Sequence, residues 1–416
     1  MQPWPRGLEG AETEKLFMMR LKIYDTMTGK KEAFTARGRE VGIYVCGITP
    51  YDVTHLGHAF TYVFFDVVAR YMRDQGFLVK YIQNLTDIDD DILKKASQLG
   101  KDWREVVSEN AKLFLEDMRW LNNVQPDVFP RATDHIKDII GTVEGLITKG
   151  HGYVRKGNVY FPVDSDRDYG KLSKLSGEKM LPIANERGNN PDDPNKRNPL
   201  DFVLWQARKP GEPSWKSPWG EGRPGWHIEC TAMSTRHLGP TVDIHGGGSD
   251  LIFPHHESSI AQSECLTGKP FVRYWMHTGM VRYQGEKMSK SLGNLVFIRT
   301  LRENFRPNEV RLSILSHHYR SQWEFTDGEV ETTRKRADLF KDVWRAESGT
   351  GEPLDHWGYE KAFFEAMEDD FDTPEAIRAL EELAAEVRKS HGLDLSGAKA
   401  FMNRAFNILG LVMEYG

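Results

Sequence analysis

Short apolar runs alternate with amphipathic stretches in the first third of the chain. Residues 41–45 are apolar and mostly β-branched, which predicts a buried parallel strand, and residues 79–82 predict a second one. A helix is predicted between them, over 58–74, and another from Asp89 onward. Together with a predicted hairpin over 20–40, these elements form a βαβ unit. Such sheets bind nucleotides at the carboxyl ends of their strands, so the residues after each strand are candidate ligand contacts.

This alternation is interrupted between residues 130 and 215. A helix is predicted over 134–149 and a strand over 157–162, followed by a polar loop over 186–199 that is rich in Asn, Asp, Pro and Arg. We interpret the segment as an insertion between two halves of one nucleotide-binding domain. The second half contains a predicted strand over 241–244, a glycine-rich loop over 246–250 and a predicted helix over 254–266.

After residue 294 the pattern is helical to the end. Thr373 as N-cap and Pro374 at the first helical position predict one helix start, and a last helix is predicted over 398–412. The predicted fold is therefore α/β: a Rossmann-type catalytic domain with an insertion, followed by an α-helical bundle. The expected boundaries are 1–129 and 216–296 for the two catalytic halves, 130–215 for the insertion and 297–416 for the bundle.

Composition and charge narrow the functional class only slightly. No apolar run approaches the roughly 20 residues of a membrane span, and the first residues lack a signal peptide's apolar stretch, so we expect a cytoplasmic protein. Three widely spaced cysteines do not suggest a disulfide framework and leave thiols available for a metal. The formal net charge of -6 is weak evidence against a large RNA partner.

Two polar motifs indicate nucleotide chemistry. His55-Leu-Gly-His58 lies between the first strand and its helix, where Gly57 would let ATP approach the backbone and both imidazoles could donate to phosphate oxygens. Lys287-Met-Ser-Lys290-Ser combines two cations with hydroxyls in a loop. Either motif alone could be structural or simply solvated, but the pair is specific for an enzyme that adenylates a carboxylate.

Longer motifs connect the chain to a known family. With Gly225-Trp-His-Ile-Glu-Cys230 and the run from Asp243 to Glu257, the chain resembles class I aminoacyl-tRNA synthetases over roughly residues 20–415. Within them it is similar to the cysteinyl branch, which cysteinyl-tRNA synthetase and mycothiol ligase share. The resemblance implies a Rossmann core, formation of cysteinyl-adenylate from ATP with Mg²⁺, and one zinc ion that binds the substrate thiolate.

The zinc ligands of that branch match Cys46, Cys230 and His255. Two thiolates and one imidazole would leave a tetrahedral zinc one open position, as in catalytic rather than structural sites. Serine is a far poorer ligand than a thiolate, so selection of cysteine needs no editing site. The alternative is that these residues are buried small hydrophobes and a core histidine, which is our interpretation of Cys265.

Other matches concern catalysis and the substrates. The resemblance assigns catalytic roles to His55, His58, Lys287 and Lys290. The positions that match the pocket for cysteine and its adenylate are Cys46, Gly47, Ile48, Thr49, Thr61, Asn84, Leu85, Thr86, Trp226, Gly248, Ser249, Asp250 and Val281. Thr86 could instead cap the following helix, and Trp226 could be core. The acidic run Asp87, Asp89, Asp90 and Asp91 is interpreted as a helix N-terminus rather than a metal site.

Three features distinguish the two members of the branch. Ser259 occupies the position of an additional glutamate ligand of the synthetase, Ile48-Thr-Pro matches the ligase form of the first motif, and Glu186-Arg-Gly resembles a ligase loop. They favour an ATP-dependent ligase that transfers cysteine to the amine of glucosaminyl-inositol in mycothiol biosynthesis, releasing AMP and pyrophosphate. We expect a monomer that uses L-cysteine, ATP and the amino-sugar inositol, without tRNA, because the chain ends soon after the helical bundle. A compact cysteinyl-tRNA synthetase is the alternative, and intact motifs disfavour a non-catalytic paralogue.

Overall fold

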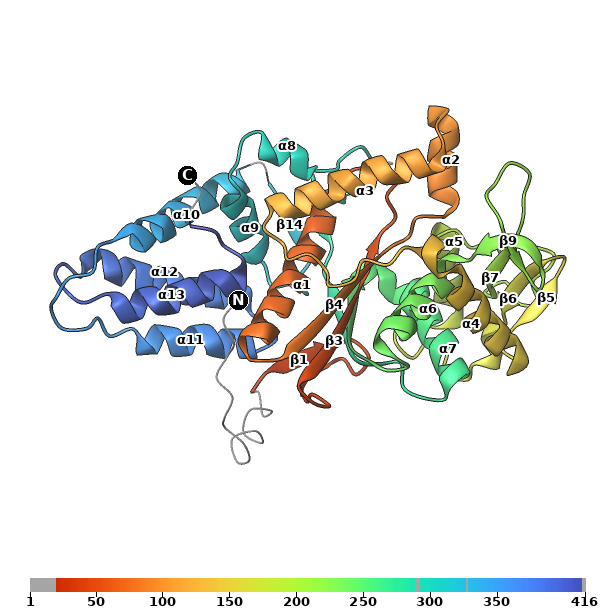
Figure 1. Cartoon of the computed structure of the whole chain (residues 1–416), viewed down its shortest axis with the longest axis horizontal. Helices are drawn as coiled ribbons and strands as arrows, with labels where there is room; N and C mark the ends of the chain where they lie inside the picture. Colours follow the sequence, from red (N-terminus) through yellow and green to blue (C-terminus); the bar gives the residue numbers. More distant parts are fainter. Residues whose placement is uncertain (1–19, 289–291, 327, 414–416) are drawn as a thin grey trace, which may run out of the picture.

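The computed structural model describes residues 20–288, 292–326 and 328–413. Figure 1 shows an elongated molecule with a parallel sheet in the middle, the insertion at one end and the C-terminal helices at the other. Lys290 therefore lies outside the described residues. Among the helices of the described chain, none has the length and apolar character that crossing a bilayer requires.

The central sheet has four parallel strands. They are β3 (Glu40–Ile48), β4 (Leu78–Leu85), β10 (Val242–Gly248) and β11 (Val272–Thr278), in the order β11-β10-β3-β4. Ile43 pairs with Ile244, so the two halves of the chain form one sheet across the insertion. The three predicted strands are confirmed, and β11 is the fourth. The hairpin β1 (Lys22–Asp25) and β2 (Lys30–Ala33) precedes the sheet as predicted.

Strand alternation determines which helix covers which face. Side chains of a strand point alternately to opposite faces, and Val41, Ile43 and Val45 pack in one hydrophobic cluster with α1 (Leu56–Asp74). Tyr44 and Cys46 belong to a second cluster, which includes side chains of α6 (Trp226–Leu238). The sheet is thus covered on both faces, as expected for a Rossmann-type fold.

The insertion is built around an antiparallel sheet that sequence patterns predicted only in part. Its strands are β5 (Tyr153–Arg155), β6 (Asn158–Phe161), β7 (Phe202–Ala207), β8 (Trp215–Ser217) and β9 (Gly220–Pro224), in the order β5-β6-β7-β9-β8. The insertion also contains the helices α4 (Ile136–Thr148) and α5 (Gly177–Glu186). Because β9 pairs with β7 on one side and with β8 on the other, this sheet extends past residue 215 to Pro224.

Further elements connect the sheet to the insertion and to the C-terminal part. On the N-terminal side are α2 (Asp90–Leu99) and α3 (Trp103–Trp120), and after β10 come η4 (Ser249–Leu251), η5 (Ile252–His256) and α7 (Glu257–Thr267). A small sheet of β12 (Val281–Tyr283), β13 (Glu286–Lys287) and β14 (Trp323–Phe325) follows β11. It includes a strand in a region that the sequence pattern predicts as purely helical.

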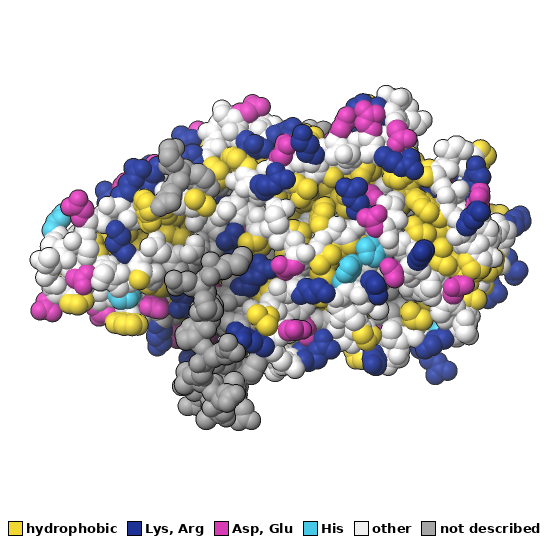
Figure 2. Space-filling view, in the orientation of Figure 1, with side chains coloured by type: hydrophobic (Ala, Val, Ile, Leu, Met, Phe, Trp, Pro, Cys, Tyr) yellow, Lys and Arg dark blue, Asp and Glu magenta, His cyan; other side chains and the backbone are white. Residues whose placement is uncertain are grey.

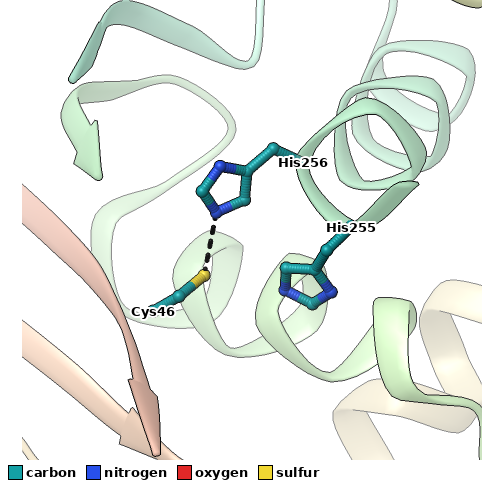
Figure 3. Close-up of side chains that lie close together, drawn as sticks. All are labelled: Cys46, His255 and His256. Carbon is teal, nitrogen blue, oxygen red and sulfur yellow. Dashed lines mark hydrogen bonds between the residues drawn. The ribbon is translucent and has the colours of Figure 1, made fainter. Parts of the chain in front are cut away.

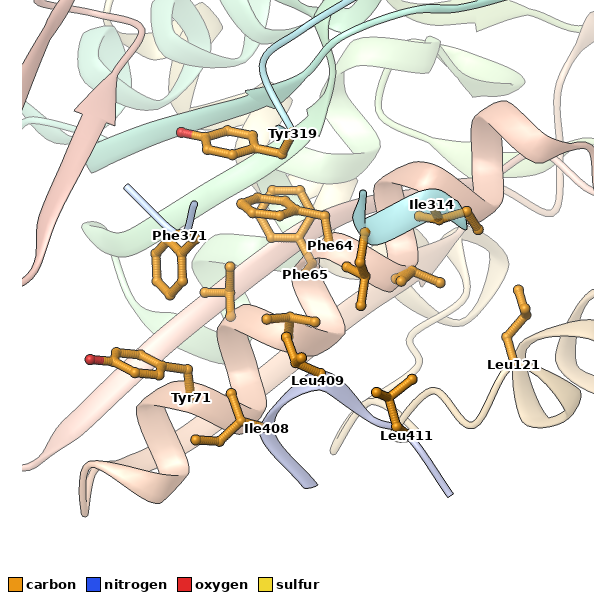
Figure 4. Close-up of a cluster of buried hydrophobic side chains, with 14 of the residues drawn as sticks. Phe64, Phe65, Tyr71, Leu121, Ile314, Tyr319, Phe371, Ile408, Leu409 and Leu411 are labelled. Atoms are coloured by element: carbon orange, nitrogen blue, oxygen red, sulfur yellow. The ribbon is translucent and has the colours of Figure 1, made fainter. Parts of the chain in front are cut away.

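The C-terminal part is mostly helical, and its helices α9 (Pro307–Leu315) and α13 (Ser396–Leu409) pack on α1. Its other helices are α8 (Ile298–Arg302), α10 (Glu329–Arg345), α11 (Trp357–Glu368) and α12 (Thr373–Lys389). Figure 4 shows Phe64, Phe65 and Tyr71 of α1 in one cluster with Ile408 and Leu409 of α13. This helical domain is therefore continuous with the core of the catalytic domain.

One predicted helix cap is wrong by one residue. The side chain of Asp372, not Thr373, accepts the hydrogen bond from the Glu375 amide at the start of α12. The Thr373 hydroxyl instead donates to the carbonyl oxygen of Leu315, 2.8 Å away, and Pro374 lies in the first turn. Both residues are good caps in isolation, and the contact with α9 decides between them.

A buried ion pair reinforces the junction between the domains. Arg311 of α9 and Asp66 of α1 form a salt bridge in which both side chains are 1% exposed. The same guanidinium donates to the carbonyl oxygens of Leu121 (2.8 Å) and Leu409 (2.5 Å) and to Asn123 Oδ1 (2.8 Å). Arg311 thereby connects α1, the end of α3 and the end of α13 through a single side chain.

Candidate active site

Two thiols meet between the sheet and α6. Because strand alternation points Cys46 toward α6, its Sγ lies 3.7 Å from the Sγ of Cys230, and both residues are buried. The hydrogen bond from the Cys46 thiol lowers the pKa of Cys230 well below its ordinary value. Burial raises the pKa of Cys46. The two thiols are thus joined by a hydrogen bond inside the protein, with Cys46 as the donor.

Two histidines complete this cluster. Candidate ligand atoms of Cys46, His255 and His256 lie within 4.8 Å of one another, and all three residues are buried (Figure 3). His256 Nε2 is 3.1 Å from Cys46 Sγ. The ring of His255 stacks on that of Trp226, with the centroids 4.5 Å apart. Sequence analysis predicted His255 and missed His256, although the two are adjacent in the chain.

A hydrogen-bonded chain lies behind His256. Its Nδ1 is 2.7 Å from His277 Nε2, and His277 Nδ1 is 2.8 Å from the hydroxyl of Thr26. Burial lowers the pKa of His256 well below its ordinary value and that of His277 to about 3, so both rings are neutral at pH 7. Neutral imidazole is the form that binds metals. Nothing in the local sequence around Thr26 or His277 indicates this role.

The cluster has the donors and spacing of a zinc site. A tetrahedral zinc with bonds of ~2.3 Å to two thiolates holds the sulfur atoms about 3.8 Å apart, close to the 3.7 Å between Cys46 and Cys230. Sulfur and imidazole nitrogen are the ligand atoms that zinc prefers. The hydroxyl of Ser259 donates to the carbonyl oxygen of His255 at 2.9 Å, so it is engaged with its own helix. The residues present therefore fit a zinc ion.

Asn84 connects the thiols to the end of the sheet. This side chain is 1% exposed, and its Oδ1 accepts from the Gly47 amide at 2.9 Å and from the Cys230 thiol at 3.5 Å. A Cβ on residue 47 would lie 1.5 Å from the backbone oxygen of Asn84, so only glycine fits there. The Asn84 amide also contacts the Thr86 hydroxyl at 3.4 Å. Thr86 is not a helix cap, because Asp89 caps α2.

The two histidines of the first motif lie at the start of α1. His55 is the N-cap, with Nδ1 accepting from the Gly57 amide at 3.1 Å, and its ring stacks on that of His58 at 3.8 Å between centroids. A Cβ on Gly57 would lie 3.0 Å from the His55 ring. The positive end of a helix attracts anions, and both imidazoles lie at this end of α1.

Backbone pairing joins this motif to the segment after the second one. His55 forms an isolated antiparallel bridge with Phe297, the Leu56 amide donates to Val296 at 2.8 Å, and the Ile298 amide donates to Thr54 at 3.1 Å. Of the second motif, the structure places the backbone of Lys287 in β13. The predicted roles of Lys287 and Lys290 remain predictions.

Some of the remaining predicted site residues line a cavity, and others are buried in the hydrophobic core. A cavity of about 1110 Å³ between the sheet and the insertion is lined in part by Thr49, Trp226 and Asp250. Thr61 is buried and hydrogen bonds the Thr278 hydroxyl at 2.7 Å. The side chains of Ile48, Leu85 and Val281 belong to the hydrophobic core, so only their backbone could contact a ligand. Gly248 ends β10, and Ser249 begins η4 with Asp250.

The acidic run near the cavity is a helix N-terminus, as interpreted from the sequence. Asp89 accepts from the Ile92 amide at 2.8 Å, and burial raises the pKa of Asp89 to about 6. Asp87 accepts from the amide and hydroxyl of Thr133 at 2.9 and 2.6 Å. Asp90 pairs with Arg223 of the insertion at 2.5 Å. These carboxylates are thus engaged with the protein.

Comparison with protein families identifies two domains. Residues 33–335 match the model described as tRNA synthetases class I (C) catalytic domain, and residues 362–414 match the DALR domain. The chain is 47% identical over 399 residues to the cysteine–tRNA ligase of Cronobacter sakazakii, covering 95% of this chain and 86% of that protein. It is 45% identical over 421 residues to the cysteine–tRNA ligase of Thermococcus kodakarensis, covering 95% and 87%.

Solved structures support the fold. A methionyl-tRNA synthetase of Mycobacterium tuberculosis in complex with methionyl-adenylate matches with a TM-score of 0.66 at 16% identity, covering 89% of this chain and 88% of that one. A leucyl-tRNA synthetase of Agrobacterium radiobacter matches with a TM-score of 0.62 at 11% identity, covering 90% and 83%. These structures show the fold, and the catalytic-domain model with the relatives of 45–47% identity shows that the chain belongs to the class I aminoacyl-tRNA synthetase family, in its cysteine-specific branch, and is an ATP-dependent, AMP-forming ligase.

Proposed function

We propose that this chain activates L-cysteine with ATP and transfers the cysteinyl group to tRNA. One observation supports the substrate: buried Cys46 contacts the Cys230 thiol and belongs to a group of possible metal ligands that includes His255. Thiolate and imidazole donors suit a metal that selects a thiol. The acceptor is supported by relatives of 45–47% identity that are named cysteine–tRNA ligases and extend over 95% of this chain.

The first step places ATP at the amino end of α1. Phosphate charge that develops on pyrophosphate would be stabilised by the helix N-terminus and by donors from His55 and His58, with Mg²⁺ as the usual counter-ion. Lys287 and Lys290 are proposed to add positive charge that stabilises the phosphates. Asp250 at the end of β10 is proposed to accept from the ribose hydroxyls.

The thiol end of the site is proposed to hold zinc through Cys46, Cys230 and His255. When bound, the metal would offer an open position to the substrate thiolate, which a serine hydroxyl fills poorly. His256 is not one of the three proposed ligands; its Nε2 contacts Cys46 Sγ, and its hydrogen bond to His277 fixes the orientation of its ring. Trp226, stacked on His255, lines the cavity next to this end of the site.

The initial expectation that tRNA is not a partner has no support from the comparisons. A DALR-domain match over 362–414 and the names of the relatives both count against it. The net charge of -6 does not exclude local binding of phosphate, because Lys and Arg side chains are interspersed with acidic ones on the face in Figure 2. tRNA is therefore our first candidate acceptor.

A small amine, as in mycothiol ligase, remains the second candidate because of Ser259. This residue stands where the synthetase pattern has a glutamate ligand, and its hydroxyl is engaged with the His255 carbonyl in a fully buried position. A neutral amine attacks an acyl-adenylate without a strong base, so the same activation chemistry would serve either acceptor.

The acceptor can be decided by one competition assay. We expect labelled cysteine and ATP to give cysteinyl-tRNA when total tRNA is added, and little amide product when glucosaminyl-inositol is added. Pyrophosphate exchange without any acceptor serves as the control for activation. Efficient amide formation without tRNA charging would reverse the order of the two candidates.

A further inference from the structure

We propose that the insertion positions the active-site segment from Asp250 to Glu257 by holding it at both ends, with Arg187 setting the nucleotide end and Glu257 the metal-binding end. The inference rests on the proposed function, because it assumes that this segment binds ATP and the metal. The segment is the connection between β10 and α7, and it carries His255 and His256. We refer to residues 169–187 of the insertion, which contact it, as the clasp.

Arg187 holds the first end. It follows the last turn of α5, and its guanidinium donates a hydrogen bond to the backbone carbonyl oxygen of Asp250. Both residues line the cavity between the sheet and the insertion. A hydrogen bond from a charged donor to a partly buried acceptor is stronger than a neutral one. Because this hydrogen bond holds the backbone of Asp250, it also determines the position of the Asp250 carboxylate relative to a bound ribose.

Glu257 holds the second end. This side chain is 1% exposed, and its two carboxylate oxygens accept from the backbone amides of Leu172 at 3.2 Å and Ser173 at 2.7 Å. The hydroxyl of Tyr169 also lies 3.2 Å from that of Ser258. Glu257 directly follows His256, so the clasp determines where α7 begins and hence where both imidazoles point.

Apolar packing fills the space between the two ends. Met180 and Ala184 of α5 form a small buried cluster with Phe253, which lies in the middle of the segment. The clasp therefore contacts the segment at its start, middle and end. The clasp is not part of the central sheet, yet it aligns the nucleotide end of the segment with its metal-binding end.

The Arg187 end can be tested by steady-state pyrophosphate exchange. Arg187→Ala is expected to raise KM for ATP about tenfold, because it removes the charge-assisted hydrogen bond that positions Asp250. The values of kcat and of KM for cysteine should stay within about twofold of wild type. Arg187→Lys should recover most of the loss. Arg208→Ala, which removes an exposed ion pair with Glu221 in the same insertion, is the matched control.

The role of Glu257 is tested by measuring zinc binding rather than enzyme activity. Glu257→Gln keeps one acceptor oxygen and is expected to weaken zinc binding about 10- to 100-fold in a chelator competition, without changing KM for ATP. An unchanged KM for ATP in Arg187→Ala, or parallel losses in both variants for both ligands, would overturn the inference. If wild type gave no cysteine-dependent exchange, the proposed function itself would be wrong, which is a distinguishable result.

Discussion

Replacing Cys230 with alanine is expected to abolish tight zinc binding and to lower kcat/KM for cysteine on the order of 10³-fold or more. The reason is that Cys46 and Cys230 are 3.7 Å apart, so each is needed for a two-thiolate site. A site built around a specific polar contact discriminates by about 10⁴–10⁵ against substrates that lack it. Metal analysis of the purified variant and pyrophosphate exchange with cysteine and with serine are the measurements.

The comparison with serine makes this prediction specific. Wild type should prefer cysteine over serine by on the order of 10⁴, and Cys230→Ala should lose most of that preference rather than only its overall rate. Cys265→Ala is the matched control, because this half-buried cysteine lies on α7 in a different hydrophobic cluster from the thiol pair. Retention of full zinc content by Cys230→Ala would refute the proposed ligand set.

Replacing Asp66 with alanine is expected to destabilise the protein by about 3–5 kcal/mol, because it leaves the buried charge of Arg311 without its partner. Arg311 also donates to Leu121, Leu409 and Asn123, so it cannot move into solvent without breaking the junction of α1, α3 and α13. Urea unfolding followed by circular dichroism should show a midpoint lowered by about 1 M or more.

A second carboxylate on α1 provides the control for this effect. Asp74 pairs with Arg404 of α13 at 2.8 Å, but the two side chains are 19% and 44% exposed. Asp74→Ala is therefore expected to cost at most about 1 kcal/mol. The double variant Asp66→Leu with Arg311→Met should recover most of the stability that Asp66→Ala loses. Equal effects of the two single alanine variants would show that burial of the Asp66 pair does not matter.

The sequence by itself determined three of the four strands of the catalytic sheet and pointed to the residues of the thiol cluster. Strands β3, β4 and β10 were predictable because each contains a short run rich in apolar residues, as a parallel strand covered on both faces requires. Cys46, Cys230 and His255 could be named because thiols and imidazoles are rare and the motifs around them are specific. The family followed from the same motifs.

The antiparallel strands of the insertion were harder to predict. β8 and β9 are short and polar, with burial on only part of their length, so neither alternation nor an apolar run marks them. The cap of α12 was ambiguous for a similar reason, since Asp372 and Thr373 are both good N-caps and only the contact of Thr373 with Leu315 separates them.

Only the tertiary structure decided which residues act together. His256 and His277 belong to the thiol cluster because η5 and β11 lie side by side, and no local pattern encodes that proximity. Arg187 contacts Asp250 because α5 of the insertion lies against the segment that follows β10, which brings residues 63 positions apart into hydrogen-bond contact. Local sequence encodes which face of an element is apolar, whereas the partners of a polar side chain depend on how distant elements pack, and the site of this protein is made of such partners.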